Sequence, residues 1–446
     1  MSLFGTDGAR GIANTELTID LAVNIARAAA ESLGSGSRVL IGRDTRTSGA
    51  MLEAALTAGF TSSGVDALIV GIVPTPALAY LINKMGAQAG VMISASHNPP
   101  RYNGIKLLDH QGRKWPIEQE ELVEHVIATG RFQAVRDTHI GQVYHYETTA
   151  LSHYVRYLES LFAGLIPALR VGLDLGHGAA TATAQTVLRS LGVHANPLFS
   201  EPEGSLINVH CGATEPSVLR EQVLIHQWDL GLAFDGDADR LIAVDHTGHI
   251  VDGDEILYVL ATGMKQQGSL AHNKVVATVM SNLGLERALE KEGIQLERTP
   301  VGDRWVANLM RERNFILGGE QSGHVILARY ASTGDGLITA LALLAEIRRR
   351  DLPLAELVRP VERYPQLLRN VKVDKTMAEW ESIPGLAALV KEAEDSLGRD
   401  GRVFIRPSGT EPLLRIMVEG LNSSEIEKWA DRLESVVQNA LESAKA

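Results

Sequence analysis

Three aspartates alternate along the segment DGDADR at positions 235–240, directly after the apolar run Leu230–Phe234. Carboxylates this close together repel one another unless a cation neutralises them, and Mg²⁺ is a hard ion that prefers oxygen ligands. A solvated acidic turn is the alternative, but the apolar run before it would bury the base of the loop. The spacing therefore predicts a magnesium site formed by Asp235, Asp237 and Asp239.

Two known acidic patterns do not fit this loop. An EF-hand loop needs Gly at its sixth position and Glu at its twelfth, where this chain has Arg240 and His246. Aspartyl-phosphate phosphatases usually place Thr or Val two residues after the second aspartate, where this chain has Asp239. Both alternatives fail on spacing.

A second polar loop, SASHNP at 94–99, follows the apolar run Ala89–Ser94. Turns and helix N-caps favour these residue types, so an ordinary turn explains them as well as chemistry does. The functional interpretation is a nucleophilic serine with a nearby proton carrier. Lys106 follows closely and would bring an ammonium group to the same place.

Two further loops carry groups that suit a phosphorylated sugar. In GGEQSGH at 318–324 the Glu, Ser and His side chains alternate and suit sugar hydroxyls, although a glycine hairpin with exposed polar tips also fits. In RPSGTEP at 406–412, with Arg415 beyond, arginine, two hydroxyls and a glycine suggest a phosphate cradle, with a plain turn as the alternative. This cradle is not a Walker loop, because the GK[ST] ending is absent. Together the four loops supply what phosphoryl transfer on a phosphorylated sugar requires: a covalent carrier, a metal site, a reader of hydroxyls and a phosphate grip.

These loops must be positioned by apolar runs that alternate with helical patterns. This alternation favours largely parallel sheets, with ligands bound at the carboxyl ends of the strands. The predicted strands are Arg38–Gly42, Val65–Ile72, Ala89–Ser94, Arg170–Asp174, Leu230–Phe234, Lys274–Val279 and a strand near Phe315–Gly318. The predicted helices are Met51–Ser63, Pro76–Lys84, Ala180–Leu191, Leu283–Glu292 and Arg304–Arg311. The end of the chain differs, with predicted strands Arg402–Ile405 and Leu414–Glu419 and an amphipathic helix Ser424–Leu441. These patterns predict three α/β domains at 1–147, 148–250 and 251–364 and a smaller α+β domain at 365–446.

Composition limits the classes of protein to which the chain can belong. Its 446 residues carry a net charge of −12, which argues against a nucleic-acid-binding face. The single cysteine, Cys211, excludes an internal disulfide framework, suits a reducing compartment and is best read as a small buried residue. We see no signal peptide and no stretch that is long and apolar enough to cross a bilayer. The sequence therefore predicts a cytoplasmic protein.

The motifs resemble those of the α-D-phosphohexomutase superfamily, in the same order over the whole chain and with one motif in each domain. The segments FGTDGARG at 4–11, NVHCGAT at 208–214, GEQSGH at 319–324 and RPSGTEP at 406–412 resemble its bacterial phosphoglucosamine mutase branch most closely. The segment PRYNG at 100–104 instead resembles the phosphomannomutase branch. The resemblance implies three related α/β domains and a smaller α+β domain around a central cleft.

The resemblance also implies a role for each candidate residue. Ser96 would carry the phosphoryl group, and one of its phosphate oxygens would complete the magnesium site of the three aspartates. Arg10 and Lys106 would lie beside the phosphoserine, with His97 and His324 as candidate proton carriers. Sugar hydroxyls and the phosphate that is not transferred would be bound by Glu320, Ser322, Arg406, Ser408, Gly409, Thr410 and Arg415.

The implied reaction interconverts glucosamine 6-phosphate and glucosamine 1-phosphate through a 1,6-bisphosphate, on the route to UDP-N-acetylglucosamine. It would use one Mg²⁺ per chain, a phosphorylated Ser96 and a hexose 1,6-bisphosphate as activator. The expected partner is a small phosphosugar, and the chain would be a monomer or a homodimer. One alternative is a phosphoglucomutase or phosphomannomutase with the same machinery. The other is a catalytically silent sugar-phosphate sensor, which would be expected to lose Ser96 or an aspartate.

Overall fold

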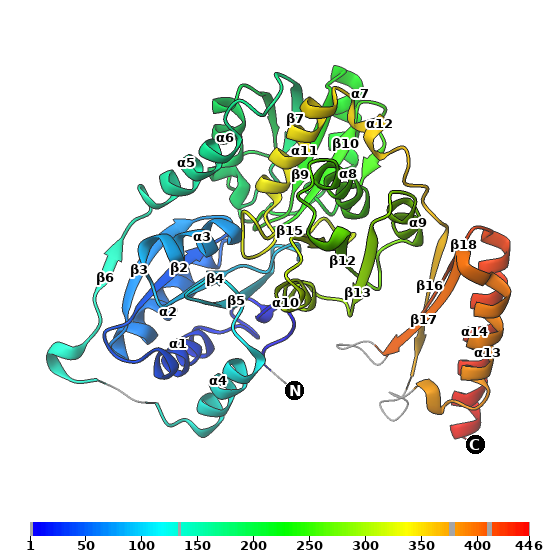
Figure 1. Cartoon of the computed structure of the whole chain (residues 1–446). Helices are drawn as coiled ribbons and strands as arrows, with labels where there is room; N and C mark the ends of the chain where they lie inside the picture. Colours follow the sequence, from blue (N-terminus) through cyan, green and yellow to red (C-terminus); the bar gives the residue numbers. More distant parts are fainter. Residues whose placement is uncertain (1–2, 133–134, 374–379, 408–412, 446) are drawn as a thin grey trace. The chain divides into compact units, whose positions relative to one another are not determined.

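The computed structural model describes residues 3–132, 135–373, 380–407 and 413–445. The chain divides into two compact units, of which one comprises residues 1–280 and 292–360 and the other residues 281–291 and 361–446. Within the described residues, the first unit contains three sheets and the second contains one (Figure 1).

The first sheet has six strands in the order β1-β5-β4-β2-β3-β6. Strands β2, β3, β4 and β6 are parallel, whereas β5 returns antiparallel to β4 and pairs with β1. The strands are β1 (Ala9–Ile12), β2 (Arg38–Arg43), β3 (Asp66–Ile72), β4 (Ala89–Ile93), β5 (Tyr102–Asp109) and β6 (Val143–His145).

Helices pack on both faces of this sheet (Figure 1). One face, with Val39, Val91 and Ile105, shares a hydrophobic core with α1, α2 and α4. On the other face, a Cβ at Gly90 would lie 2.3 Å from Cδ1 of Ile82, so this glycine allows α3 to approach the sheet closely. The helices are α1 (Ile19–Leu33), α2 (Gly49–Ser62), α3 (Thr75–Met85) and α4 (Ile117–Thr129).

The second and third sheets have the orders β11-β10-β9-β7-β8 and β13-β12-β14-β15. Their strands are β7 (Arg170–Asp174), β8 (His194–Leu198), β9 (Leu230–Phe234), β10 (Leu241–Asp245), β11 (Ile250–Val251), β12 (Lys274–Thr278), β13 (Gln295–Thr299), β14 (Leu317–Gly319) and β15 (Val325–Leu327). Their helices are α5 (Ala150–Phe162), α6 (Ala184–Ser190), α7 (Ser217–His226), α8 (Gly253–Gln266), α10 (Asp303–Arg313), α11 (Gly336–Arg350) and α12 (Leu354–Val358).

One structural pattern recurs in all three sheets. A strand with a parallel neighbour is followed directly by an antiparallel partner, giving the pairs β4–β5, β9–β10 and β14–β15. The loops inside these pairs are the polar segments SASHNP, DGDADR and EQSGH. The repeated hairpin therefore places one motif of each sheet at the carboxyl end of a core strand.

Several predicted elements differ from the structure in their bounds. Strands β7 and β9 have the predicted limits, whereas the strand predicted near Phe315–Gly318 is Leu317–Gly319. The helix predicted at Ala180–Leu191 is divided into a 3₁₀ turn at Ala179–Ala182 and α6. The division lies at Thr183, whose backbone, with φ −134° and ψ −45°, is outside the helical region.

The second unit is an antiparallel sheet in the order β16-β18-β17, packed against long helices. Its elements are α9 (Leu283–Lys291), β16 (Gln366–Lys372), α13 (Leu386–Leu397), β17 (Gly401–Pro407), β18 (Leu413–Gly420) and α14 (Ser423–Lys445). Helix α9 is distant in sequence from the rest but is tied to it, because the Leu283 amide donates to Glu419 (2.9 Å) and Arg287 pairs with Asp400 (3.2 Å). The α+β character predicted for the chain end is therefore present.

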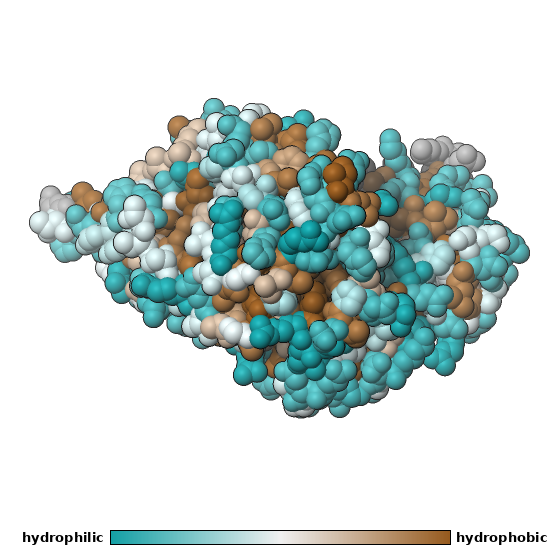
Figure 2. All heavy atoms as spheres, turned by 90° about the horizontal axis from the view of Figure 1, so that it is seen from above, coloured by the Kyte–Doolittle hydropathy of each residue, from teal (hydrophilic) through white to brown (hydrophobic). Residues whose placement is uncertain are grey.

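In the described part of the chain, every helix falls short of the length and apolar character that crossing a membrane requires. On the face drawn in Figure 2, hydrophilic side chains cover most of the surface, and hydrophobic ones gather in separate small groups. Cys211 is buried, and burial raises the pKa of its thiol to about 12, which agrees with the interpretation of a small, unreactive core residue.

Candidate active site

The three hairpin loops of the first unit meet at one point. The Ser96 hydroxyl, from the β4–β5 loop, donates to Oδ2 of Asp235 in the β9–β10 loop at 2.7 Å. The β9–β10 loop in turn contacts the β14–β15 loop, where the Leu241 amide donates to the carbonyl of Gly323. The structure thus brings the serine, aspartate and sugar-loop motifs together.

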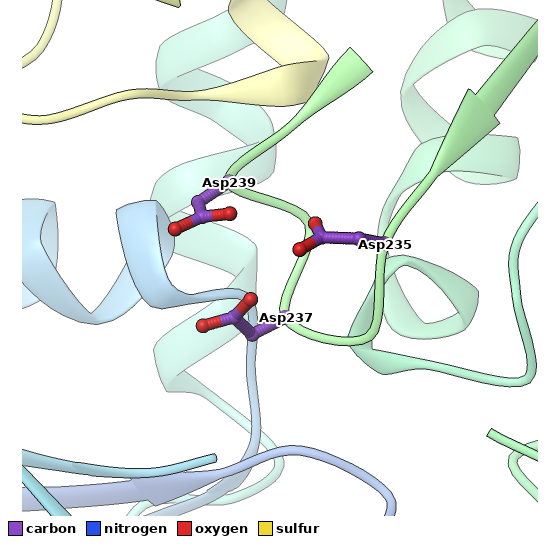
Figure 3. Close-up of side chains that lie close together, drawn as sticks. All are labelled: Asp235, Asp237 and Asp239. Atoms are coloured by element: carbon purple, nitrogen blue, oxygen red, sulfur yellow. The ribbon is translucent and has the colours of Figure 1, made fainter. Parts of the chain in front are cut away.

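The three aspartates of the β9–β10 loop direct their carboxylates toward a common space (Figure 3). One ligand atom from each of Asp235, Asp237 and Asp239 lies within 4.8 Å of the others, and all three residues are buried. Burial, followed by the charges of Asp239 and Asp237, raises the pKa of Asp235 well above its usual value. The buried Oδ1 atoms of Asp237 and Asp239 have no hydrogen-bond partner among the described residues. Crowded carboxylates with unsatisfied oxygens fit the donor set that Mg²⁺ requires.

Ser96 lies at the tip of the β4–β5 loop in an unusual conformation. Its φ of 51° is in the left-handed region, which non-glycine residues rarely adopt, and the residue is 1% exposed. Nδ1 of His97 lies 3.4 Å from the serine Oγ. Burial and the nearby charges of Arg240 and Arg10 lower the pKa of His97 to about 4, so its imidazole is neutral at pH 7.

Lys106 reaches the aspartate loop from β5. Its side chain is 2% exposed, and Nζ lies 2.8 Å from Oδ2 of Asp237 and 3.1 Å from Oδ2 of Asp7. Burial opposes its charge, but the carboxylates of Asp237 and Asp7 outweigh burial and raise the pKa of Lys106. The side chain is therefore a fixed ammonium beside Asp237.

Three residues that the sequence analysis did not single out extend this network. Asp7 pairs with Arg10, Lys106 and Lys114, and these cations hold its pKa well below the usual range against the effect of burial. Lys114 also contacts Asp303, with 2.6 Å between Nζ and Oδ2. The sequence signal for Asp7 was its place in FGTDGARG, whereas Lys114 and Asp303 lie outside all the quoted motifs.

The β14–β15 loop presents its residues differently. His324 is buried, with Nδ1 3.4 Å from Oδ2 of Asp239, while the Gly334 amide donates to Nε2 at 3.2 Å. Burial opposes a charge on His324, but Asp239 outweighs it and raises the pKa to about 9. Glu320 accepts from the Gly302 amide, and burial raises its pKa, whereas Ser322 is exposed.

The predicted phosphate cradle belongs to the second unit. Arg406 and Arg415 are direct partners across β17 and β18. Burial, followed by the charge of Arg415, lowers the pKa of Arg406. Ser408, Gly409 and Thr410 lie outside the described residues.

Comparison with known families matches nearly the whole chain. The phosphoglucomutase/phosphomannomutase models match residues 1–134 as alpha/beta/alpha domain I, 152–248 as domain II, 252–364 as domain III and 368–436 as the C-terminal domain. The four matched segments follow the order of the four motif loops.

Curated relatives and solved structures give the same result. The phosphoglucosamine mutases of Desulforamulus reducens and Rhodococcus opacus are 46% and 47% identical over 442 and 441 residues, covering 98% of this chain and 99% of each relative. A phosphoglucomutase/phosphomannomutase family protein from Burkholderia thailandensis superposes with a TM-score of 0.81 at 25% identity, covering 100% of this chain and 98% of that one. The N-acetylphosphoglucosamine mutase of Aspergillus fumigatus, solved with GlcNAc-6P and magnesium, shares the fold with a TM-score of 0.68 at 18% identity, covering 98% of this chain and 96% of that one.

Proposed function

The chain belongs to the phosphoglucosamine mutases of the phosphoglucomutase/phosphomannomutase family, and on this premise we propose that it interconverts glucosamine 6-phosphate and glucosamine 1-phosphate with Ser96 as the phosphoryl carrier. The observation that carries the proposal is the 2.7 Å contact between Ser96 Oγ and Asp235 inside a cluster of three buried aspartates. A phosphoryl group on this oxygen would adjoin both the carboxylates that need a cation and the Lys106 ammonium.

The three aspartates would hold one Mg²⁺, together with an oxygen of the Ser96 phosphoryl group. The buried Oδ1 atoms of Asp237 and Asp239, which have no hydrogen-bond partner among the described residues, support this assignment. When bound, Mg²⁺ withdraws charge from the transferring phosphoryl group. Lys106, which contacts Asp237 and Asp7, adds fixed positive charge beside this site, and so does Arg10, which contacts Asp7.

The reaction comprises two phosphoryl transfers, the first from Ser96 to the sugar and the second from the sugar to Ser96. Oxygen O1 of glucosamine 6-phosphate attacks the phosphorus of phosphoserine 96, so that the O1–P bond forms while the Ser96 O–P bond breaks. The resulting 1,6-bisphosphate turns over, and its O6–P bond breaks while Ser96 regains the phosphoryl group. Glucosamine 1-phosphate leaves, and a hexose 1,6-bisphosphate can load a serine that has lost its phosphoryl group.

Two imidazoles are candidate proton carriers. His324 lies in the loop of Glu320, and its pKa of about 9 leaves it protonated at pH 7, so it would donate a proton rather than accept one. His97 lies beside Ser96 Oγ instead, where its neutral ring can exchange a proton with the serine oxygen. Glu320 and Ser322 would bind sugar hydroxyls.

The phosphate that is not transferred lies on C6 in one half-reaction and on C1 in the other. Its binding site must therefore recognise a phosphate without recognising the carbon that bears it. We assign this role to Arg406 and Arg415, with Ser408, Gly409 and Thr410. The pairing of Arg406 with Arg415 across β17 and β18 supports the assignment, because two neighbouring guanidinium groups can both donate to one phosphate.

The substrate is tested by comparing kcat/KM for glucosamine 6-phosphate, glucose 6-phosphate and mannose 6-phosphate with the same preparation. We expect glucosamine 6-phosphate to lead by about tenfold or more, as for a site that binds a polar group its competitors lack. A higher value for either neutral sugar would contradict the assignment and favour a phosphoglucomutase or phosphomannomutase. A cytoplasmic location and a monomeric or homodimeric state remain predictions from the sequence.

A further inference from the structure

The backbone at Ser96 is held from several directions. Its left-handed φ of 51° is costly for a serine and persists only where the surroundings determine it. The Ser96 amide donates to Oγ of Ser94 at 2.9 Å, and the Ser94 hydroxyl donates to Asp44 at 2.6 Å. The first serine of SASHNP therefore supports the second one.

Arg46 shapes this loop from within the first sheet. Its side chain is fully buried, and Nε donates to Asp44. The other four N–H groups reach carbonyl oxygens of the loop at 2.7–2.9 Å, those of Ser96, Asn98, Pro99 and Tyr102. All five N–H donors of the guanidinium are used, and four of them bind the backbone of the serine loop and the first residue of β5.

Asn208, which lies between strands β8 and β9 of the second sheet, binds the same loop. Its Nδ2 donates to the Ser96 carbonyl at 2.9 Å and approaches the Asn98 carbonyl at 3.3 Å. Carbonyl oxygens only accept, so the amide nitrogen and not the oxygen must face them. Asn208 opens the NVHCGAT segment, to which the proposed chemistry assigns no role.

The aspartate loop passes against the same junction. A Cβ at Gly236 would lie 2.6 Å from the Ser96 carbonyl oxygen and 2.9 Å from Nδ2 of Asn208. The neighbours of Gly236 in the chain are Asp235 and Asp237. The serine carbonyl, the Asn208 amide and the backbone of the aspartate loop thus form one contact between the two sheets.

We propose that Asn208 is a positioning residue that fixes the serine loop in register with the aspartate loop, so that the phosphoryl group on Ser96 meets Asp235, Asp237 and Asp239. Arg46 determines the shape of the loop, and Asn208 determines where that shape sits relative to the aspartates. The proposal rests on the proposed role of Ser96 and goes beyond it, because the hydrogen bonds that Asn208 donates in the described structure go to the backbone of the serine loop.

Two variants remove the donor while tolerating the left-handed backbone of Asn208, which has φ 59°. Asn208→Asp keeps the size of the side chain, and Asn208→Gly removes it. The matched control is Asn196→Asp, because Asn196 on β8 also donates to backbone carbonyls, those of His194 on β8 and Val171 on β7.

Each variant is assayed with glucosamine 6-phosphate, and its phosphoserine is observed by ³¹P NMR during a titration with Mg²⁺. We expect both Asn208 variants to lose about 10- to 100-fold in kcat with little change in KM, as for a small misplacement of reacting groups. The Mg²⁺ concentration that moves the phosphoserine resonance halfway should rise about tenfold, one decade in affinity. Asn196→Asp should match the wild type in both measurements.

The outcomes separate this proposal from the one on which it rests. A wild-type enzyme that gains no phosphate on Ser96 even after incubation with glucose 1,6-bisphosphate would overturn the proposed function itself. A phosphorylated, active wild type whose Asn208 variants keep its kcat and its Mg²⁺ titration would overturn only the positioning role. Equal losses in Asn196→Asp would also overturn it, because they would show general destabilisation of the second sheet.

Discussion

Buried and half-buried charges of alternating sign form a connected path beside Ser96. Asp237 contacts Lys106, Lys106 contacts Asp7, and Asp7 contacts Lys114, which contacts Asp303. Removing one partner of a buried pair leaves an uncompensated charge and is costly. Asp235 and Asp239 lie outside this path. The pKa of Asp235, raised by burial and by the charges of Asp239 and Asp237, shows the crowding that a cation would relieve.

Asp237→Asn tests the cation site at the scale of one residue. The amide keeps the shape of the side chain but removes one anionic ligand and one partner of Lys106. We expect a loss of several kcal/mol of transition-state stabilisation, the scale of a metal acting as a Lewis acid, measured as kcat/KM with added Mg²⁺.

The control for this variant is Asp245→Asn. Asp245 is also buried, but its Oδ1 accepts from Thr247 and His249 in the turn after β10. Its activity should remain close to that of the wild type. Activity that survives exhaustive EDTA treatment of the wild-type enzyme would contradict the metal assignment.

Local spacing was enough to predict part of this site. The three aspartates Asp235, Asp237 and Asp239 are close in sequence, and the apolar run before them predicted that the base of their loop is buried. The pairs Asp7–Lys114 and Lys114–Asp303 join positions more than a hundred residues apart, and they form only once the sheets pack. No periodicity or turn signal encodes such pairing.

At the scale of elements, the structure repeats one type of hairpin. A core strand ends in a polar loop and returns antiparallel, as in β4–β5, β9–β10 and β14–β15. The sequence predicted the core strands from their apolar runs but not the returning strands. Strand β5, for example, contains Asn103 and Lys106, which are polar yet buried because each finds a partner across the fold.

One contact between elements predicts how stability depends on pH. The Tyr154 hydroxyl on α5 donates to Asp335, whose other oxygen accepts from the first amides of α11. Burial raises the pKa of Asp335 to about 6 in the folded protein, above the value of about 3.9 for an unfolded chain. The stabilisation from its proton is complete below pH 4 and is lost as the pH rises through 6.

Thermal unfolding of the wild type and Asp335→Asn at pH 5 and pH 8 measures this effect. Relative to the variant, the wild type should gain about 1 kcal/mol on going from pH 8 to pH 5, or roughly 2 °C in Tm. Tyr154→Phe removes a hydrogen bond that favours the carboxylate, so its pH dependence should extend to higher pH. A Tm difference between wild type and Asp335→Asn that is the same at both pH values would show that Asp335 titrates normally.

At the scale of the molecule, the chain combines three related α/β domains with a smaller α+β domain, as the motifs implied. The sequence bounds of the two compact units differ from those of the matched domains. Helix α9 lies inside the third matched segment yet belongs to the second unit, where Leu283 and Arg287 find Glu419 and Asp400. Sequence order alone could not predict this, because the partners lie beyond position 399.

The role of the second unit is tested by Arg415→Met, which keeps the apolar stem and removes the guanidinium. We expect KM for glucosamine 6-phosphate to rise about tenfold or more, with a smaller change in kcat, because a charge-assisted grip on the distal phosphate is lost. Arg369→Met is the control, because Arg369 in the same sheet pairs with Asp431 and Glu434 on α14. Loss of kcat alone, at unchanged KM, would place Arg415 outside the phosphate grip.

The central claim is that Ser96 carries the phosphoryl group, and intact-protein mass spectrometry with peptide mapping tests it most directly. The chain, incubated with glucose 1,6-bisphosphate, should gain one phosphoryl group that maps to Ser96, and glucosamine 6-phosphate should then remove it. Ser96→Ala should gain none and lose nearly all activity while keeping the Tm of the wild type. A phosphoryl group on another residue, or a Ser96→Ala variant with near wild-type turnover, would contradict the account.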